Sequence, residues 1–195
     1  MIFSPSTSTW FPPSQSLWGS PVLIYGKAVI GEDYPAELRE FFVVRLKISP
    51  ASLATLVEGL QSLGKNKSSV ASIKQTIHAI NAMNPKPADL KCLEGCNILP
   101  TRGPSLEDET SLTHSHDDFA INDREKLAKI FTGCVKFLDF PLEEVLHLDP
   151  FLQALGLSKN FLSRLCAEET DCGDDGTFEE NLTAKFKNRA YHLLR

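Results

Sequence analysis

Residues 49–64, with the sequence SPASLATLVEGLQSLG, decide the fold class of this chain. Ser49 and Pro50 are a typical helix start, because a serine hydroxyl accepts hydrogen bonds from free N–H groups and proline fits the first turn. Gly64 lies where a helix is expected to end, since glycine favours the C-cap. Between these ends, apolar residues recur at helical spacing, namely Leu53, Leu56, Val57, Leu60 and Leu63. The stretch therefore predicts an amphipathic helix.

Two further helices are predicted on either side of this one. Residues 68–85, SSVASIKQTIHAINAMNP, begin with a capping serine, Ser68 or Ser69, and end at Asn84-Pro85. The apolar stripe of this helix is Val70, Ile73, Ile77, Ile80 and Met83. Upstream, after Pro35, the helical period appears again, at Leu38, Phe41, Phe42 and Leu46. With the extended segment VLIYGKAVI (22–30), these helices predict a mainly helical unit over residues 22–96.

Apart from VLIYGKAVI, which is β-rich and predicts either a short strand or an extended segment, strand-like segments are found beyond residue 96. NILPTR (97–102), DFAIN (118–122) and CVKFLDF (134–140) are short, apolar and bounded by turn residues, so each predicts a strand. Between the first two lies GPSLEDETSLTHSHD (103–117), which contains four acidic residues and no lysine or arginine. We expect this segment to be a solvated, mobile acidic loop.

The strands alternate with short helices in the second half of the chain. Asp123 and Ser158 are predicted helix N-caps, and LEEVLHL (142–148) and PFLQALGL (150–157) read as two short helices. A last helix is predicted over residues 178–194. Residues 97–195 therefore form an α+β unit, and the whole chain belongs to the helix-dominant α+β class: a helical N-terminal unit, a small three-strand unit in the middle and a helical C-terminal unit.

Residues 1–21 contain both tryptophans of the chain, Trp10 and Trp18, among many serines and four prolines. This composition predicts an irregular segment. Aromatic side chains bury roughly 150–250 Å² each, so two tryptophans indicate that the segment packs on something or contacts a partner. We single out Trp10, Trp18, Phe41 and Phe42 as tentative interaction residues. For the two phenylalanines a purely structural role is favoured, because they lie on a helical stripe.

Composition argues against several classes of partner. The chain has 195 residues, of which 42% are hydrophobic, and a net charge of -5, so a basic face for nucleic acid is not expected. No apolar run approaches the roughly 20 residues of a membrane helix. No signal-peptide block precedes Lys27, and the odd number of cysteines indicates reduced thiols. We expect a globular intracellular protein, cytoplasmic or nuclear, that binds neither nucleic acid nor membranes.

Motifs of enzymes are incomplete in this sequence. Gly59-x4-Gly64-Lys65 is close to a phosphate-binding loop, but Asn66 stands where Ser or Thr must hold magnesium, and Gly59 lies within a predicted helix. DCGDDGTFEENL (171–182) lacks acidic ligands at positions three and twelve of a calcium loop. There is no Gly-x-Ser-x-Gly motif and no activating context for a cysteine. We therefore expect a protein that is not an enzyme, with no catalytic residue and no cofactor.

Two half-sites for a metal ion remain as an alternative. THSHDD (113–118) contains His114, His116 and two aspartates, and Cys92 and Cys96 have a spacing that zinc sites use. Neither half-site has an obvious partner in the sequence. Three cysteines, at positions 92, 134 and 166, are expected to be packed thiols instead.

A family resemblance is carried by a series of short phrases. They are WFPPSQSLW (10–18), GKAVIGEDYPAELREFFVVRLKISPASLATLVEGL (26–60), IKQTIHAINAMNP (73–85), NILPTR (97–102), DDFAINDREKLAKIF (117–131), VKFLDFPLEEV (135–145) and DPFLQALGLSKNFLSRL (149–165). Read together, they resemble a region of very large fungal and plant proteins of the NO VEIN-like and sacsin-like type. The resemblance covers most of the chain.

What the resemblance implies is a role inside a larger machine. Such proteins carry an N-terminal GHKL-type ATPase domain followed by long helical regions, and this chain is similar to the region after the ATPase. The ATPase motifs are not found, so no nucleotide-binding residue is implied. The implied function is a non-catalytic scaffold or interaction segment of a multidomain ATPase, or a truncated paralogue of one. Its partners would be other domains of a larger parent chain or a protein partner.

Two rival hypotheses stay open. The first is a free-standing protein–protein adaptor whose acidic loops, 105–118 and 168–180, meet a basic partner; charge runs are more often solvated faces. The second is a metal-binding protein that uses His114 and His116 or Cys92 and Cys96.

Overall fold

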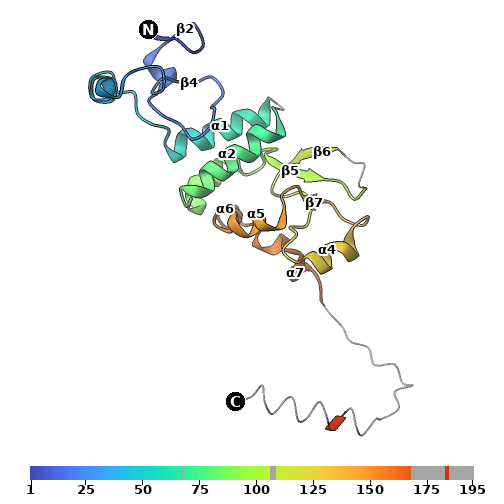
Figure 1. Ribbon diagram of the computed structural model, residues 1–195. Coiled ribbons are helices and arrows are strands. Elements are labelled where there is room, and N and C mark those ends of the chain that lie inside the picture. Colours follow the sequence, from blue (N-terminus) through green and yellow to red (C-terminus); the bar gives the residue numbers. More distant parts are fainter. Residues whose placement is uncertain (67, 106–108, 168–182, 185–195) are drawn as a thin grey trace.

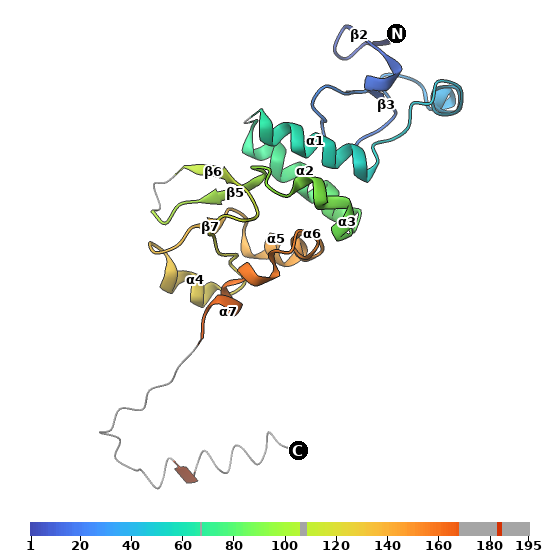
Figure 2. The same ribbon diagram turned by 180° about the vertical axis from the view of Figure 1, so that it is seen from behind.

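The protein was analysed as a computed structural model that describes residues 1–66, 68–105, 109–167 and 183–184. It has the expected fold class, a helix-dominant α+β architecture with a small three-stranded sheet. Figure 1 shows an N-terminal unit at one end, the helices α1 and α2 next to it, and the sheet with the short helices beyond them. The opposite view shows α3, which contacts α1 and α6 (Figure 2).

The helix α1 (Leu53–Lys65) begins later than its sequence predicts. Its N-cap is Ser52, whose hydroxyl accepts a hydrogen bond from the Thr55 N–H at 3.3 Å. The expected start at Ser49-Pro50 is wrong because this backbone is engaged elsewhere. The Ser49 carbonyl accepts from the Trp18 N–H, and the Ala51 N–H donates to the Gly19 carbonyl at 2.7 Å.

Gly64 does not cap α1, contrary to expectation. The helix continues to Lys65, and Asn66 is the C-cap residue. A Cβ at Gly64 would lie 2.7 Å from the Asn97 carbonyl oxygen and 2.8 Å from a methyl carbon of Ile98. The glycine is therefore required because the chain before the sheet passes directly over this end of α1.

The helix α2 (Val70–Ala82) has Ser69, one of the two predicted serines, at its N-cap position, although the Ser69 side chain makes no capping hydrogen bond. Ile73, Ile77 and Ile80 are buried, so the predicted stripe is confirmed at these positions. Met83 does not belong to the stripe, because it is the C-cap residue and is exposed. A short helix α3 (Pro87–Leu90) and a 3-10 turn (Lys91–Leu93) follow.

The sheet has the order β6-β5-β7 and is antiparallel, with β5 (Leu99–Arg102) in the centre, β6 (Thr110–Thr113) on one side and β7 (Phe137–Leu138) on the other. Two of the three expected strand positions are confirmed. The expected strand over 118–122 is wrong, because this segment makes only single bridges, at Ala120 and Ile121. The expected acidic loop 103–117 instead contains β6. Residues 119–121 are all buried, which a one-sided strand pattern does not allow.

Short helices complete this part of the molecule: α4 (Glu125–Phe131), α5 (Leu142–His147), α6 (Asp149–Ala154), a 3-10 turn (Leu157–Asn160) and α7 (Leu162–Leu165). The prediction that Asp123 caps α4 is wrong. Its carboxylate accepts hydrogen bonds from the backbone N–H and the hydroxyl of Ser163, so it satisfies the first turn of α7. Ser158 lies inside the 3-10 turn and caps no helix. Apart from positions 183 and 184, the predicted helix 178–194 lies outside the described residues.

The first 48 residues, here called the N-terminal unit, contain more regular structure than the sequence predicts, and the helix expected after Pro35 is a 3-10 turn followed by a π-helix. Strands β1 (Ile2–Ser4) and β2 (Thr9–Phe11) form a hairpin, and β3 (Ser16–Leu17) pairs in parallel with β4 (Ala28–Val29). A 3-10 turn (Pro13–Gln15) lies between them, and a 3-10 turn (Ala36–Leu38) and a π-helix (Phe41–Arg45) follow.

Long-range hydrogen bonds hold the β1–β2 hairpin in place. Ser4 and Ser6 donate hydroxyl hydrogen bonds to the Asp33 carboxylate, at 2.6 and 3.1 Å. The Tyr34 hydroxyl donates to the Phe3 carbonyl at 2.6 Å. The expectation of an irregular segment over 1–21 is wrong because these partners lie about thirty residues away in the sequence.

The apolar interior consists of two clusters. The smaller cluster lies in the N-terminal unit and is formed by Ile2, Ala28, Ile30, Phe42 and Ile48. The larger cluster takes side chains from α1, α2, the sheet, α5 and α6, on both sides of residue 97, and also includes Leu17 and Ile24. These two residues anchor the N-terminal unit on the rest of the molecule. In the part of the chain that the structure describes, no helix has the length and apolar character that crossing a membrane requires.

Candidate functional site

Exposed apolar side chains are concentrated in the N-terminal unit. Among the described residues, seven of the eleven exposed large hydrophobic side chains lie in the first 44 positions. These seven, here called the exposed apolar set, are Met1, Trp10, Leu23, Tyr25, Leu38, Phe41 and Val44. Single exposed apolar residues are normal on protein surfaces, so the notable feature is that most of those described lie in this one small unit.

Phe42 organises the aromatic side chains of this unit. It is 5% exposed, and its ring centroid lies 4.7 Å from that of Tyr34 and 5.4 Å from that of Trp18. Phe41 lies at 5.6 Å from Phe42 in an edge-on arrangement but is 51% exposed. The two neighbouring phenylalanines therefore differ in role, since Phe42 fills the smaller core and Phe41 faces solvent.

The π-helix Phe41–Arg45 explains this division. The Leu46 N–H donates to the Phe41 carbonyl at 3.1 Å, five residues back, so this turn contains one residue more than an α-helical turn. The extra residue changes which side chains face inward, and both Phe41 and Val44 become exposed. Helical spacing alone predicts a common stripe for Phe41 and Phe42, which is why the sequence does not separate them.

The two tryptophans occupy different positions. Trp18 is half-buried against the smaller core. Its carbonyl oxygen lies so close to Gly31 that a Cβ at position 31 would be only 1.8 Å from this oxygen. Trp10 lies on β2 opposite Phe3, with ring centroids 5.3 Å apart, and is 59% exposed. Trp18 therefore supports the unit, whereas Trp10 presents apolar surface. Tyr25 and Val44, which the sequence does not single out, are also exposed.

The two metal half-sites remain local arrangements. His114 Nε2 lies 3.1 Å from an Asp117 carboxylate oxygen, and His114 Nδ1 accepts from the His116 N–H at 3.3 Å. The Cys96 thiol contacts the Cys92 carbonyl at 3.6 Å. Over residues 1–66, 68–105 and 109–167, no three His, Cys, Asp or Glu side chains gather in a geometry that could hold a metal ion.

The expectation that three cysteines are packed thiols is wrong. Cys92 and Cys134 are exposed, and Cys166 is only half-buried. Cys92 lies on the outer side of a 3-10 turn whose inner side is filled by Leu90 and Leu93. Cys134 follows Gly133, whose positive φ of 89° lies in the left-handed region. Cys134 also lines a cavity of about 860 Å³ with His116, Asp118, Lys136 and Lys159, whose charges are mixed and indicate no single ligand.

Asp139 is the main electrostatic junction outside the N-terminal unit. Its carboxylate accepts hydrogen bonds from Lys74 Nζ at 2.8 Å and from the Thr110 hydroxyl at 2.9 Å, and pairs with Arg102 at 3.1 Å. Burial raises the pKa of Asp139, but the hydrogen bonds from Lys74 and Thr110 and the charges of Lys74 and Arg102 outweigh this, so the pKa is lowered overall. The junction connects α2 to all three strands and has a structural role.

These features define a helix-dominant α+β domain with an N-terminal unit that exposes a set of large apolar side chains. The chain belongs to a protein family defined by a domain of unknown function (DUF8348), whose family model matches residues 54–166, more than half of the chain. The match begins in α1 and ends just after α7, so it spans most of the larger core and leaves the exposed apolar set outside. No curated protein and no solved structure matches the chain.

Proposed function

We propose that this chain is a non-catalytic interaction segment whose N-terminal unit contacts another protein or another part of a larger parent chain. The observation that carries the proposal is the exposed apolar set, seven large side chains within 44 residues. Trp10 and Phe41 are the central contact residues of this proposal. Trp18 and Phe42 support them from the smaller core.

The energetic argument starts from the area that a partner would cover. An aromatic side chain contributes roughly 150–250 Å² in all, and Phe41 and Trp10 leave 51% and 59% of theirs in water. Covering about 100 Å² at about 25 cal/mol per Å² yields about 2–3 kcal/mol for each side chain. Several such residues can supply the hot spots of a protein interface, in which aromatic side chains dominate.

We further propose that the segment serves a NO VEIN-like or sacsin-like multidomain protein, where it would connect a distant ATPase domain to a partner. The resemblance of seven short sequence stretches to proteins of this type supports the proposal, together with the absence of complete catalytic motifs. The adaptor alternative based on acidic loops is less well supported, because the segment 105–118 contains β6, which is tied into the sheet. Its second loop, 168–180, lies outside the described residues.

A site-specific crosslinking experiment tests the proposal. A photoreactive phenylalanine analogue is placed at position 41 of the native gene product in its source cells, and a control analogue at Ile130, which is also apolar and 68% exposed but lies on α4. We expect position 41 to give one defined adduct, either with a partner or within a longer chain, and position 130 to give none. Equal or diffuse crosslinking from both positions would refute the proposal. An immunoblot against residues 36–83 in the same cells shows whether the adduct forms within a polypeptide larger than 21.6 kDa.

A further inference from the structure

The three-stranded sheet has a free edge at β6, and Pro100 in the central strand shows which backbone groups face outward. Proline has no N–H, and the Pro100 carbonyl accepts from the Asp139 N–H at 2.8 Å, so Pro100 faces β7. In an antiparallel ladder, alternate residues face opposite neighbours. Leu99 and Thr101 therefore face β6, and their partners in β6 are Thr113 and Ser111.

It follows that Thr110 and Leu112 direct their backbone N–H and C=O groups away from β5. Within the part of the chain that the structure describes, no hydrogen bond is made by these four groups. A row of unpaired backbone groups on an edge strand is a template for another strand. Peptide-binding domains use such an edge to add a strand from a partner.

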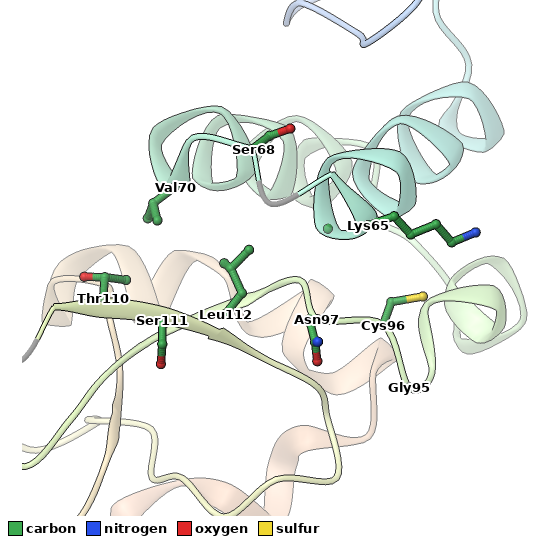
Figure 3. A pocket seen from close by; sticks show the side chains of 10 residues that line it. Lys65, Ser68, Val70, Gly95, Cys96, Asn97, Thr110, Ser111 and Leu112 are labelled. Atoms are coloured by element: carbon green, nitrogen blue, oxygen red, sulfur yellow. The ribbon is translucent and has the colours of Figure 1, made fainter.

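A cleft of about 680 Å³ runs along this edge (Figure 3). It is lined by β6, by residues 95–97 and by the end of α1 with the start of α2, and no residue of β5 contributes. Leu112 and Val70, both half-buried, point into the space between strand and helices, whereas Ser111 points to the other side of the strand. At one end of the cleft, Gly64 packs against Asn97.

Charge indicates what the cleft prefers. Lys65 lies at the Gly64–Asn97 end of the cleft, with its side chain extending outward from α1 and away from Val70 and Leu112, and is the only charged side chain among the described residues that line the cleft. It is exposed, and no ion pair involves it in the described part of the chain. An occupant with a carboxylate at this end would complement it. An acidic side chain fits better than a chain terminus, because terminal carboxylates are captured by backbone nests rather than by an exposed lysine.

We propose that β6 binds an extended segment of a partner protein by strand addition. The backbone of this segment pairs with Thr110 and Leu112, one of its apolar side chains enters between Leu112 and Val70, and an aspartate or glutamate pairs with Lys65. This surface is separate from the exposed apolar set and belongs to the region that the family model matches.

The probe is a displayed library of random ten-residue peptides, selected on the full chain, followed by binding measurements with the synthesised peptides. We expect the selected peptides to alternate β-branched or aromatic residues with polar ones and to contain an acidic residue. Lys65→Glu should weaken their binding at least tenfold, whereas Lys126→Glu, at an exposed lysine on α4, should leave it unchanged.

A matched pair at Thr110 tests the backbone contact. Thr110→Pro removes the outward N–H, and Thr110→Val removes the hydroxyl that donates to Asp139 but keeps the N–H. We expect binding to the valine variant and none to the proline variant, with near-UV circular dichroism used to compare their folding. If the proline variant does not fold, the Lys65→Glu result decides.

Three outcomes would overturn the proposal. The first is that no peptide is enriched, and the second is that the peptides bind Lys65→Glu and Thr110→Pro as well as the unaltered chain. The third is a chain that is dimeric by light scattering and becomes monomeric in Thr110→Pro, because a second copy would then cover the edge.

Discussion

Replacing Asp139 by asparagine should destabilise the protein in a way that depends on pH. The carboxylate is 17% exposed and its nearest partner, Lys74, is 26% exposed, so solvent screens the pair only in part. A hydrogen bond to a charged group contributes about 1.5–3 kcal/mol, and we take the lower end for Lys74 and less than 1 kcal/mol for the more exposed Arg102. The sum is about 2 kcal/mol, or about 4–8 °C in the melting temperature of a chain of this size.

The pH dependence has a definite sign. Because the pKa of Asp139 is lowered in the folded state, its contribution is present above the ordinary aspartate pKa of about 3.9 and is lost as the pH falls through the lowered pKa. Denaturant unfolding at pH 7, 5, 4 and 3 should therefore show the unaltered chain and Asp139→Asn converging in acid. Glu125→Gln is the matched control. It removes one charge from a fully exposed pair with Lys129 and should leave the free energy of unfolding unchanged.

The reasoning would be refuted if Asp139→Asn had the same unfolding free energy as the unaltered chain at pH 7. A constant difference between the two from pH 7 to pH 3 would also refute it, because the loss would then not come from the ionised carboxylate.

Further predictions concern the N-terminal unit. Gly31→Ala should disrupt the N-terminal unit, because the new Cβ would lie 1.8 Å from the Trp18 carbonyl oxygen. Gly19→Ala should be tolerated, because a Cβ at position 19 has open space around it. Tryptophan fluorescence of the two variants measures the difference. Phe42→Ala should cost about 3–5 kcal/mol, because it empties the centre of the smaller core. Trp10→Ala should leave the unfolding free energy nearly unchanged and reduce crosslinking from position 41, and unchanged crosslinking would count against a shared contact surface.

The parts of the fold that could be predicted are those with strong local periodicity. The apolar residues of α1 and α2 repeat at helical spacing, and their burial follows the prediction at Leu56, Leu60, Ile73 and Ile77. The failures come from partners that are distant in the sequence. Ser49 does not begin a helix, because its carbonyl accepts a hydrogen bond from the Trp18 N–H. Asp123 does not cap α4, because its carboxylate accepts a hydrogen bond from the N–H of Ser163, forty residues away.

The candidate site was predictable only in part, for the same reason. Aromatic composition singles out Trp10 and Phe41, but their exposure depends on a hairpin and a π-turn that no period indicates. The edge of β6 was missed because residues 103–117 read as an acidic loop, and their pairing with β5 is visible only in the structure. Lys65 stood out as part of an incomplete phosphate-binding motif, and the structure places it at the end of a cleft instead.

The helix α1 connects the two surfaces proposed here. On the side facing the N-terminal unit, Gly59 lets Ile24 approach, because a Cβ at position 59 would lie only 3.0 Å from an Ile24 methyl carbon, and Ala51 just before the helix bonds to Gly19. Near the C-terminal end of α1, Gly64 packs against Asn97 at one end of the cleft along β6. Both junctions depend on a glycine inside a helix, which costs about 1 kcal/mol relative to alanine at each position. Such a cost is consistent with close packing at both positions, so α1 lies against both the N-terminal unit, at Ile24, and the chain that leads into the sheet, at Asn97.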